Sequence, residues 1–152
     1  MGNKITNIQG VSLRKLTQLH DERGAVYHYL KTTSPEFAGF GEIYYSKILS
    51  NIVKGWKMHK ESIQNFCVPY GVLKIVLVDN RKDSPTVGTI NEIILNDSDQ
   101  YYLLTIPPNI WYSFKSLSPD FTLLSNFINI EHNPSEGENL PLNSPKIKYE
   151  WV

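Results

Sequence analysis

The sequence predicts an all-β protein of jelly-roll type that folds as one domain over residues 1–152. Aromatic residues make up 12% of the chain, helix-length amphipathic patterns are scarce, and turn residues recur roughly every eight to fifteen positions. A run of short strand-like segments without a long helix favours a sandwich-like barrel. At 152 residues the chain is long enough for one hydrophobic core and short for two ordinary domains.

Each expected strand is a short segment rich in β-branched or aromatic residues and is bounded by Gly, Pro, Asn, Asp or Ser. The expected strands cover residues 11–16, 26–31, 42–49, 52–59, 64–69, 72–79, 88–95, 101–106, 111–114, 121–130 and 146–151. The turn signals between them lie at 21–24, 69–71, 83–85, 96–99 and 107–109. Short helical turns are expected around 34–38 and 134–140.

The segment 72–78 differs from the other expected strands because it is nearly all apolar. A strand of this kind is buried on both faces rather than on one. We therefore expect a second sheet or a partner subunit to cover it.

The overall charge excludes some classes of partner. Fifteen basic and fifteen acidic residues give a formal net charge of zero, without the basic cluster that a nucleic-acid binder needs. Neutral chains associate readily, which favours an oligomer. No stretch approaches the ~18 apolar residues of a membrane span, and residues 1–5 lack an apolar signal core. We expect a cytoplasmic protein without a membrane partner.

One segment has the spacing of a metal-binding hairpin but lacks most of the ligands. Lys57, His59, Gln64 and Gly71 occupy the slots of the H-x-H, Glu and Gly pattern of cupin barrels, which the chain resembles here. A second segment resembles the cupin P-x-G-x-x-H motif and has Tyr112 in place of its histidine. Transition ions need three or four His, Cys or carboxylate ligands. We expect a barrel that uses neither a metal nor a cofactor.

Several separate segments carry the motifs of one known family. Residues 21–24 read D-E-R-G, residues 54–55 fall where that family has R-G, and residues 79–88 match V-D-x-R-x-x-S-P-T-x-G from the aspartate onwards. Residues 106–118 are similar to its I-P-x-G-x-x-H-G-F-x-x-L-S pattern. The chain thus resembles the dTDP-4-dehydrorhamnose 3,5-epimerase family of nucleotide-sugar epimerases over roughly residues 17–151.

This resemblance implies a double-stranded β-helix that forms a homodimer by exchanging strands. It also implies that a nucleotide-linked sugar, such as a dTDP sugar, enters the barrel mouth. The chemistry is not carried over, because the family's catalytic positions hold other residues. Lys57 stands at the base, Ser144 at the aspartate that orients the base, and Asn126 near the tyrosine that returns a proton.

A second group of cupins, the nucleotide-sugar 3,4-ketoisomerases, resembles the chain in a different way. Residues 58–60 match the end of that group's R-G-x-H-A-H-K motif, in which the second histidine is the base. Residues 106–111 look like its I-P-P-x-x-W. The match at residues 79–88 is absent from this group, so the chain lies between the two.

Three residues are the candidate catalytic groups. Lys57 and His59 are two apart on an expected strand, so they share a face. His59 is suited to removing the proton next to a 4-keto group, and Lys57 is suited to lowering the pKa of His59 or holding the enolate oxygen. Tyr112 is a candidate donor to the opposite face of the sugar. The alternative is that these side chains line a pocket without turnover.

Five more residues are candidate substrate contacts. Arg23 is expected to pair with a diphosphate, or else with Asp21 or Glu22 in its turn. Lys54 is a second phosphate candidate, and Gln64 is expected to hydrogen-bond to the ligand or to His59. Trp56 and Trp111 are expected to wall the pocket or to pack in the core.

The sequence therefore predicts an epimerase or isomerase acting on a nucleotide-linked 4-keto-6-deoxysugar in deoxysugar or surface-polysaccharide biosynthesis. The alternatives are a 3,4-ketoisomerase and a pseudoenzyme that binds the same sugar.

Overall fold

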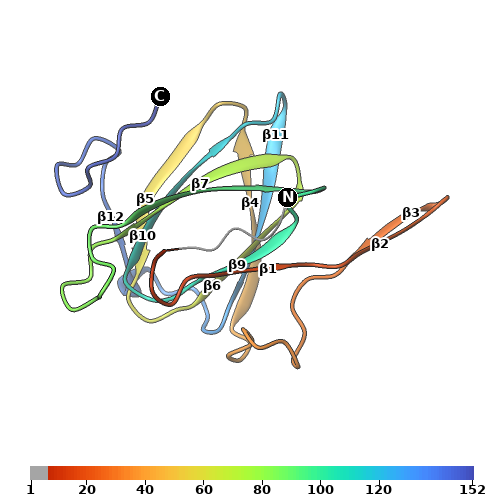
Figure 1. The fold of residues 1–152 in the computed structure, drawn as a ribbon, viewed down its shortest axis with the longest axis horizontal. Helices are drawn as coiled ribbons and strands as arrows, with labels where there is room; N and C mark the ends of the chain where they lie inside the picture. Colours follow the sequence, from red (N-terminus) through yellow and green to blue (C-terminus); the bar gives the residue numbers. More distant parts are fainter. Residues whose placement is uncertain (1–6) are drawn as a thin grey trace.

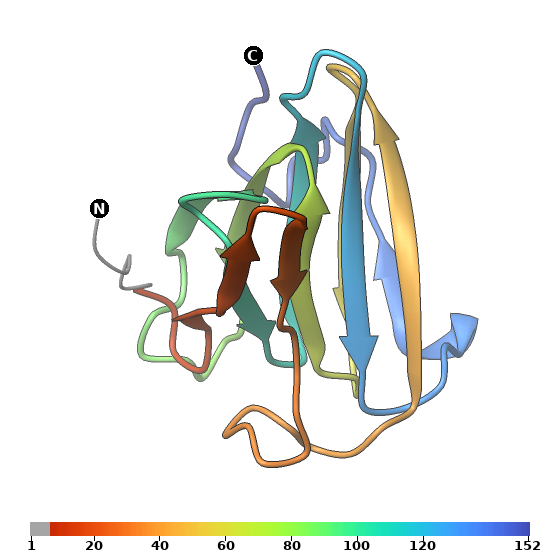
Figure 2. The same ribbon diagram turned by 90° about the vertical axis from the view of Figure 1, so that its right-hand side faces the viewer.

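A computed structural model describes residues 7–152 as a barrel made of two antiparallel five-stranded sheets (Figures 1 and 2). The first sheet contains, in spatial order, β1 (Ser12–Lys15), β9 (Tyr102–Ile106), β6 (Gln64–Tyr70), β11 (Phe121–Ile128) and β4 (Glu42–Leu49). The second contains β12 (Gly137–Asn139), β5 (Val53–His59), β10 (Ile110–Ser116), β7 (Val72–Asp79) and β8 (Ile90–Asn96). The predicted jelly-roll fold is confirmed.

The main core lies between the two sheets. Alternate residues of each strand point inward, as the two-residue period of a strand requires. On β7 these are Leu73, Ile75 and Leu77, which are fully buried. They belong to one cluster with residues of the facing sheet such as Phe66 of β6 and Leu124 of β11.

The outer face of β7 is covered by the C-terminal segment. Val76 and Val78 form a second cluster with Ile147, against which Tyr149 and Trp151 pack. The expected burial of β7 on both faces is confirmed, and the cover on the outer side is residues 140–151 of the same chain. The strand expected at 146–151 is wrong, because this segment packs through its side chains without joining a backbone ladder.

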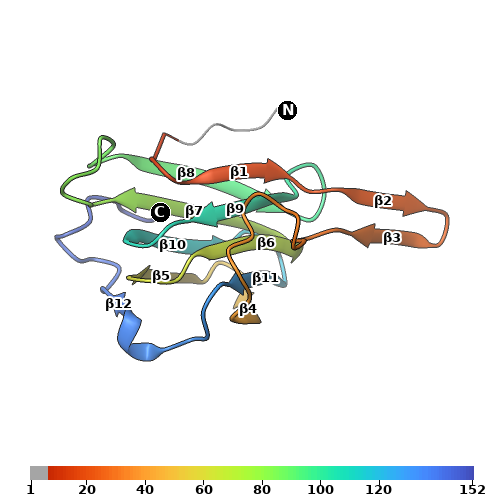
Figure 3. The same ribbon diagram turned by 90° about the horizontal axis from the view of Figure 1, so that it is seen from below.

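A two-stranded hairpin projects from the barrel (Figures 1 and 3). It is formed by β2 (Gln18–Asp21) and β3 (Gly24–Tyr27), which pair around the predicted turn at 21–24. The single strand expected at 26–31 is therefore wrong in its bounds. Leu19 and Val26 on the hairpin are more than half exposed.

Two connections place the site. The turn before β10 contains Asn109 in the left-handed region (φ 69°), and its backbone N–H donates to the His59 carbonyl at the end of β5 (2.7 Å). After β11 the chain forms the short 3₁₀ helix η1 (Pro134–Glu136) and then β12. The helical turn expected over 134–140 is thus shorter than predicted and continues into a strand.

No helix within residues 7–152 is long and apolar enough to cross a membrane. Residues 1–5, in which no signal core was expected, fall outside the described part of the chain.

Candidate functional site

A cavity of about 290 Å³ lies between the two sheets, and we call it the main cavity because both sheets line it. One sheet contributes Lys54 and Lys57 of β5 and Tyr112 of β10. The other contributes Tyr44 of β4 and Asn126 of β11. The cavity is therefore walled on two sides by polar groups from separate sheets.

Two smaller cavities share Lys57 with the main one. One, of about 160 Å³, is also lined by His59 and His132, and the other, of about 270 Å³, by Tyr44 and His132. The expectation that residues 57 and 59 face one cavity is therefore met at the smaller of these sites. The ring of His132 lies edge-on to that of Tyr44, at 6.4 Å between centroids.

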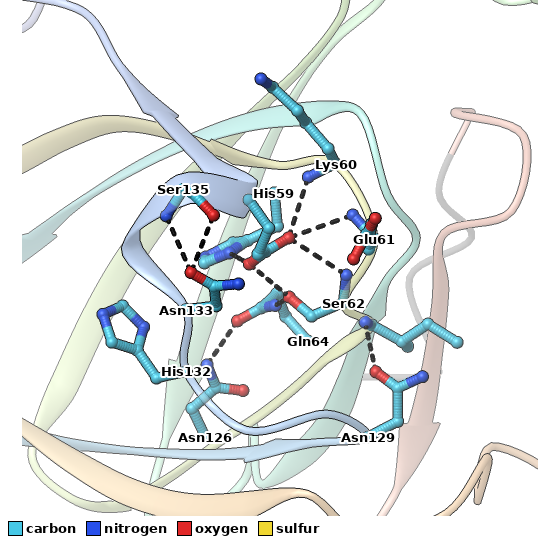
Figure 4. Close-up of polar contacts among 12 residues, drawn as sticks. His59, Lys60, Glu61, Ser62, Gln64, Asn126, Asn129, His132, Asn133 and Ser135 are labelled. Atoms are coloured by element: carbon cyan, nitrogen blue, oxygen red, sulfur yellow. Dashed lines mark hydrogen bonds and ion pairs between the residues drawn. The ribbon is translucent and has the colours of Figure 1, made fainter.

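Glu136 of η1 holds His59 in a buried ion-pair geometry, and Figure 4 shows His59 with the residues that follow it, Lys60, Glu61 and Ser62. Its carboxylate oxygen Oε1 lies 2.5 Å from His59 Nδ1, and both side chains are about 95% buried or more. The other oxygen accepts the backbone N–H groups of Lys60, Glu61 and Ser62 at 3.0 to 3.3 Å. The turn after β5 thus forms a concave set of donors around one carboxylate.

These contacts fix the charge and tautomer of the pair. Burial opposes ionisation of Glu136, but His59 and the backbone donors outweigh it and lower the carboxyl pKa to about 2. Burial lowers the pKa of His59 more than Glu136 raises it. Neutral His59 therefore carries its proton on Nδ1, directed at Glu136, and leaves the lone pair of Nε2 free to accept.

Tyr112 supplies the hydrogen bond to that lone pair. Its hydroxyl lies 3.0 Å from His59 Nε2 and donates to it. Burial raises the pKa of Tyr112 well above its ordinary value, so the group stays a phenol. Because Tyr112 lines the main cavity, it lies between His59 and that space.

Gln64 lies beside this pair but not in the cavity wall. It is buried, donates from Nε2 to Ser62 Oγ (2.6 Å), and accepts from Asn126 Nδ2 (2.5 Å). Ser62 Oγ in turn donates to Glu136 (3.1 Å). Gln64 thus reaches His59 through Ser62 and Glu136, not directly as one of its expected roles required.

Two of the other predicted site residues, Trp111 and Arg23, lie away from the main cavity, and Trp56 only borders it. The Trp111 side chain belongs to the cluster on the outer face of the second sheet, so of its two expected roles it has core packing and not the pocket wall. Adjacent residues of a strand point to opposite faces, and Tyr112 takes the inner one. Trp56 borders the cavity, but its ring is fully buried in the same outer cluster. Arg23 lies at the hairpin tip, where it pairs with Asp21 (2.7 Å) and is 84% exposed.

Two residues of the site were missed by the sequence reasoning. Neither Glu136 nor Tyr44 is among the candidates that the sequence indicates, and nothing in the sequence distinguishes Tyr44 from the aromatic residues around it. The nearest sequence signal for Glu136 is that it follows Pro134 at the end of a polar segment. Within residues 7–152 no three His, Cys, Asp or Glu side chains are grouped so that they could hold a metal ion.

Comparison with known proteins places this chain in a family. Residues 5–152 match the family described as dTDP-4-dehydrorhamnose 3,5-epimerase. The chain belongs to this family of nucleotide-sugar epimerases, which are isomerases of deoxysugar and polysaccharide biosynthesis.

Individual relatives agree with this assignment. A crystal structure of a dTDP sugar isomerase from Desulfovibrio desulfuricans G20 is 40% identical, with a TM-score of 0.92 over 95% of this chain and 92% of that one. The probable low-salt glycan biosynthesis epimerase Agl13 of Haloferax volcanii is 29% identical over 149 residues, 95% of each chain. The spore coat polysaccharide biosynthesis protein SpsL of Bacillus subtilis is 25% identical over 146 residues, 95% of this chain and 96% of that one.

Replacing Glu136 by Gln should weaken the fold and change its response to acid. Because the Glu136 pKa is lowered from 4.5 to about 2, its contribution is complete above pH 4.5 and is lost as the pH falls toward 2. We expect Glu136→Gln to reduce the free energy of unfolding at pH 7 by about 2 to 3 kcal/mol. The difference from wild type should shrink steadily below pH 4.5, as followed by urea denaturation.

The matched control is Glu138→Gln. Glu138 lies two residues further on, is half exposed, and pairs with Lys60 at 3.4 Å, so its loss should cost less than about 1 kcal/mol. Equal effects of the two substitutions would show that Glu136 is not the anchor described above.

Proposed function

We propose that the protein isomerises a nucleotide-linked 4-keto-6-deoxysugar by removing the proton next to the keto group. The observation that supports this best is the ordered chain Glu136–His59–Tyr112, which leads from a buried carboxylate to a phenol oxygen at the cavity wall. His59, neutral and with its Nε2 lone pair accepting, can serve as the general base that such an enolisation needs.

We assign the removal of the proton to His59 acting through Tyr112. The proton leaves the sugar carbon for the Tyr112 oxygen as the phenol proton passes to His59 Nε2. The electron pair of the broken C–H bond forms the enolate, and Glu136 stabilises the imidazolium. Since burial disfavours a phenolate at Tyr112, the two transfers occur together. Tyr112 is then part of the base, whereas the sequence suggested an acid on the opposite face.

We assign Lys57 and Lys54 to binding negatively charged oxygens of the substrate. Lys57 lines all three cavities, and within residues 7–152 its amine makes no hydrogen bond or ion pair to another side chain. We propose that it holds the developing enolate oxygen. Lys54, also at the main cavity, is assigned to a phosphate oxygen. In this scheme the family's usual base, orienting aspartate and tyrosine are replaced by a different set.

The family description and the name of the D. desulfuricans relative both support a dTDP-linked sugar. The names of the two curated relatives support a place in glycan or surface-polysaccharide assembly. We propose that the protein does this work in the cytoplasm, with a nucleotide sugar as its small-molecule partner and without a cofactor.

We also propose a homodimer in which the projecting hairpin reaches a second copy. The side chains of Leu19 and Val26 on β2 and β3 are more than half exposed and offer apolar surface for such a contact. Arg23 at the tip is then carried toward the partner's cavity, where it can pair with a diphosphate.

The dimer proposal is tested by sedimentation equilibrium. A mass near twice the 17.5 kDa chain is expected for the wild type, and the double change Leu19→Ser with Val26→Ser should shift it toward the monomer. A wild-type protein that sediments as a monomer at all concentrations would refute the proposal.

The proposed reaction is tested by following deuterium from D₂O into a dTDP-4-keto-6-deoxysugar by NMR. The wild type should incorporate deuterium next to the keto group, and His59→Asn should lower the rate by about 100-fold or more. His28→Asn is a control, because His28 lines none of the cavities described above and its backbone carbonyl accepts from Tyr101. Absence of exchange in the wild type would leave a sugar-binding protein without turnover.

A further inference from the structure

The ionised Glu136 carboxylate determines which group donates in each hydrogen bond that leads away from it. The ionised carboxylate can only accept, so the Ser62 hydroxyl donates to it (3.1 Å). Ser62 Oγ therefore accepts from the amide nitrogen of Gln64 (2.6 Å). This orientation of Gln64 turns its carbonyl oxygen toward β11.

The same logic fixes Asn126 on β11. Its amide nitrogen donates one hydrogen to the Gln64 oxygen (2.5 Å) and the other to the hydroxyl oxygen of Tyr44 (3.0 Å). Its own oxygen accepts from the backbone N–H of Asn65 (3.2 Å), which excludes the flipped amide. Asn126 is buried and all its polar groups are in use.

The two tyrosines at the cavity are consequently different. Tyr112 donates its hydrogen to His59. Tyr44 accepts from Asn126, so its hydrogen remains available, and within residues 7–152 no other group is hydrogen-bonded to this hydroxyl. Burial raises the pKa of Tyr44, so it is protonated at neutral pH. Tyr44 thus presents the cavity with a donor, and Tyr112 with an acceptor.

The donor and the acceptor come from opposite walls. Tyr112 lies on β10 of one sheet and Tyr44 on β4 of the other, and both line the main cavity of about 290 Å³. A planar enolate held between the sheets therefore has Tyr112 toward one face and Tyr44 toward the other. Inversion at carbon requires this arrangement, since the proton must leave from one face and arrive at the other.

We infer that Tyr44 is the catalytic acid that protonates the enolate on the face opposite Tyr112. This assignment rests on the proposed function. The Tyr44 O–H bond breaks as the new C–H bond forms, and the phenolate left behind is stabilised by the Asn126 amide. Tyr44 then regains a proton from solvent while the imidazolium of His59 gives one up, so the cycle closes without a co-reactant. Tyr44 is partly exposed, which gives water access.

The test measures exchange and inversion separately in Tyr44→Phe, with a dTDP-4-keto-6-deoxysugar in D₂O. Proton removal by His59 and Tyr112 is intact in this variant, so deuterium should enter the sugar at close to the wild-type rate with configuration retained. Formation of the epimer should fall by about 100-fold or more. Tyr45→Phe is the matched control, because the adjacent side chain on β4 points outward and is 59% exposed.

Each other outcome overturns the inference in a recognisable way. Normal epimer formation by Tyr44→Phe would show that another group is the acid. If Tyr44→Phe lost deuterium exchange and epimer formation equally, with an unchanged urea midpoint of unfolding, Tyr44 would not act on one face of the sugar alone. Absence of exchange in the wild type would remove the proposed reaction itself, and with it the role of Tyr44.

Discussion

The site depends on one buried contact, the Glu136 carboxylate seated against His59 and the three backbone N–H groups that follow it. Burying a carboxylate is costly unless donors replace its water, and here they come from both a side chain and a turn. The contact also fastens η1 and β12 to the end of β5, where β12 pairs with residues 57–59. One interaction therefore sets both the wall of the cavity and the state of its histidine.

The same contact determines where protons lie in the site. Since Glu136 only accepts, the groups attached to it must donate, and this direction passes through Ser62, Gln64 and Asn126 to Tyr44. On the other side it passes through His59 to Tyr112. Tyr112 and Tyr44 carry the same hydroxyl group, but Tyr112 donates its hydrogen to His59 and Tyr44 accepts one from Asn126. The direction of each hydrogen bond depends on the whole network, because reversing one bond would leave a buried donor or acceptor unsatisfied.

Much of the fold could be predicted from local pattern. The strands 42–49 and 72–79 were predicted with their observed bounds. The alternating pattern of the first and the continuous apolar run of the second are each typical of a strand. The bounds of the β2–β3 hairpin were mispredicted because its strands are mostly exposed, so their sequence lacks a clear alternation of apolar and polar residues. The C-terminal segment has strand-like residues, but it covers an apolar face with side chains alone, which composition does not distinguish from pairing.

The site was only partly predictable. The two-residue spacing of Lys57 and His59 placed them together because a strand has that period. Glu136 lies 77 positions from His59, and no local rule joins a 3₁₀ turn to a distant strand. Tyr44 and Tyr45 are adjacent and chemically identical, so only the inward direction of one of them, known from the fold, separates an acid from a surface residue.

The tautomer and charge of His59 test this account most directly. Nitrogen chemical shifts of ¹⁵N-labelled protein at pH 7 should report a neutral ring with Nδ1 protonated and strongly hydrogen-bonded, and with Nε2 accepting. A ring protonated on Nε2, or an imidazolium at that pH, would contradict the directions assigned to every bond from Tyr112 to Tyr44.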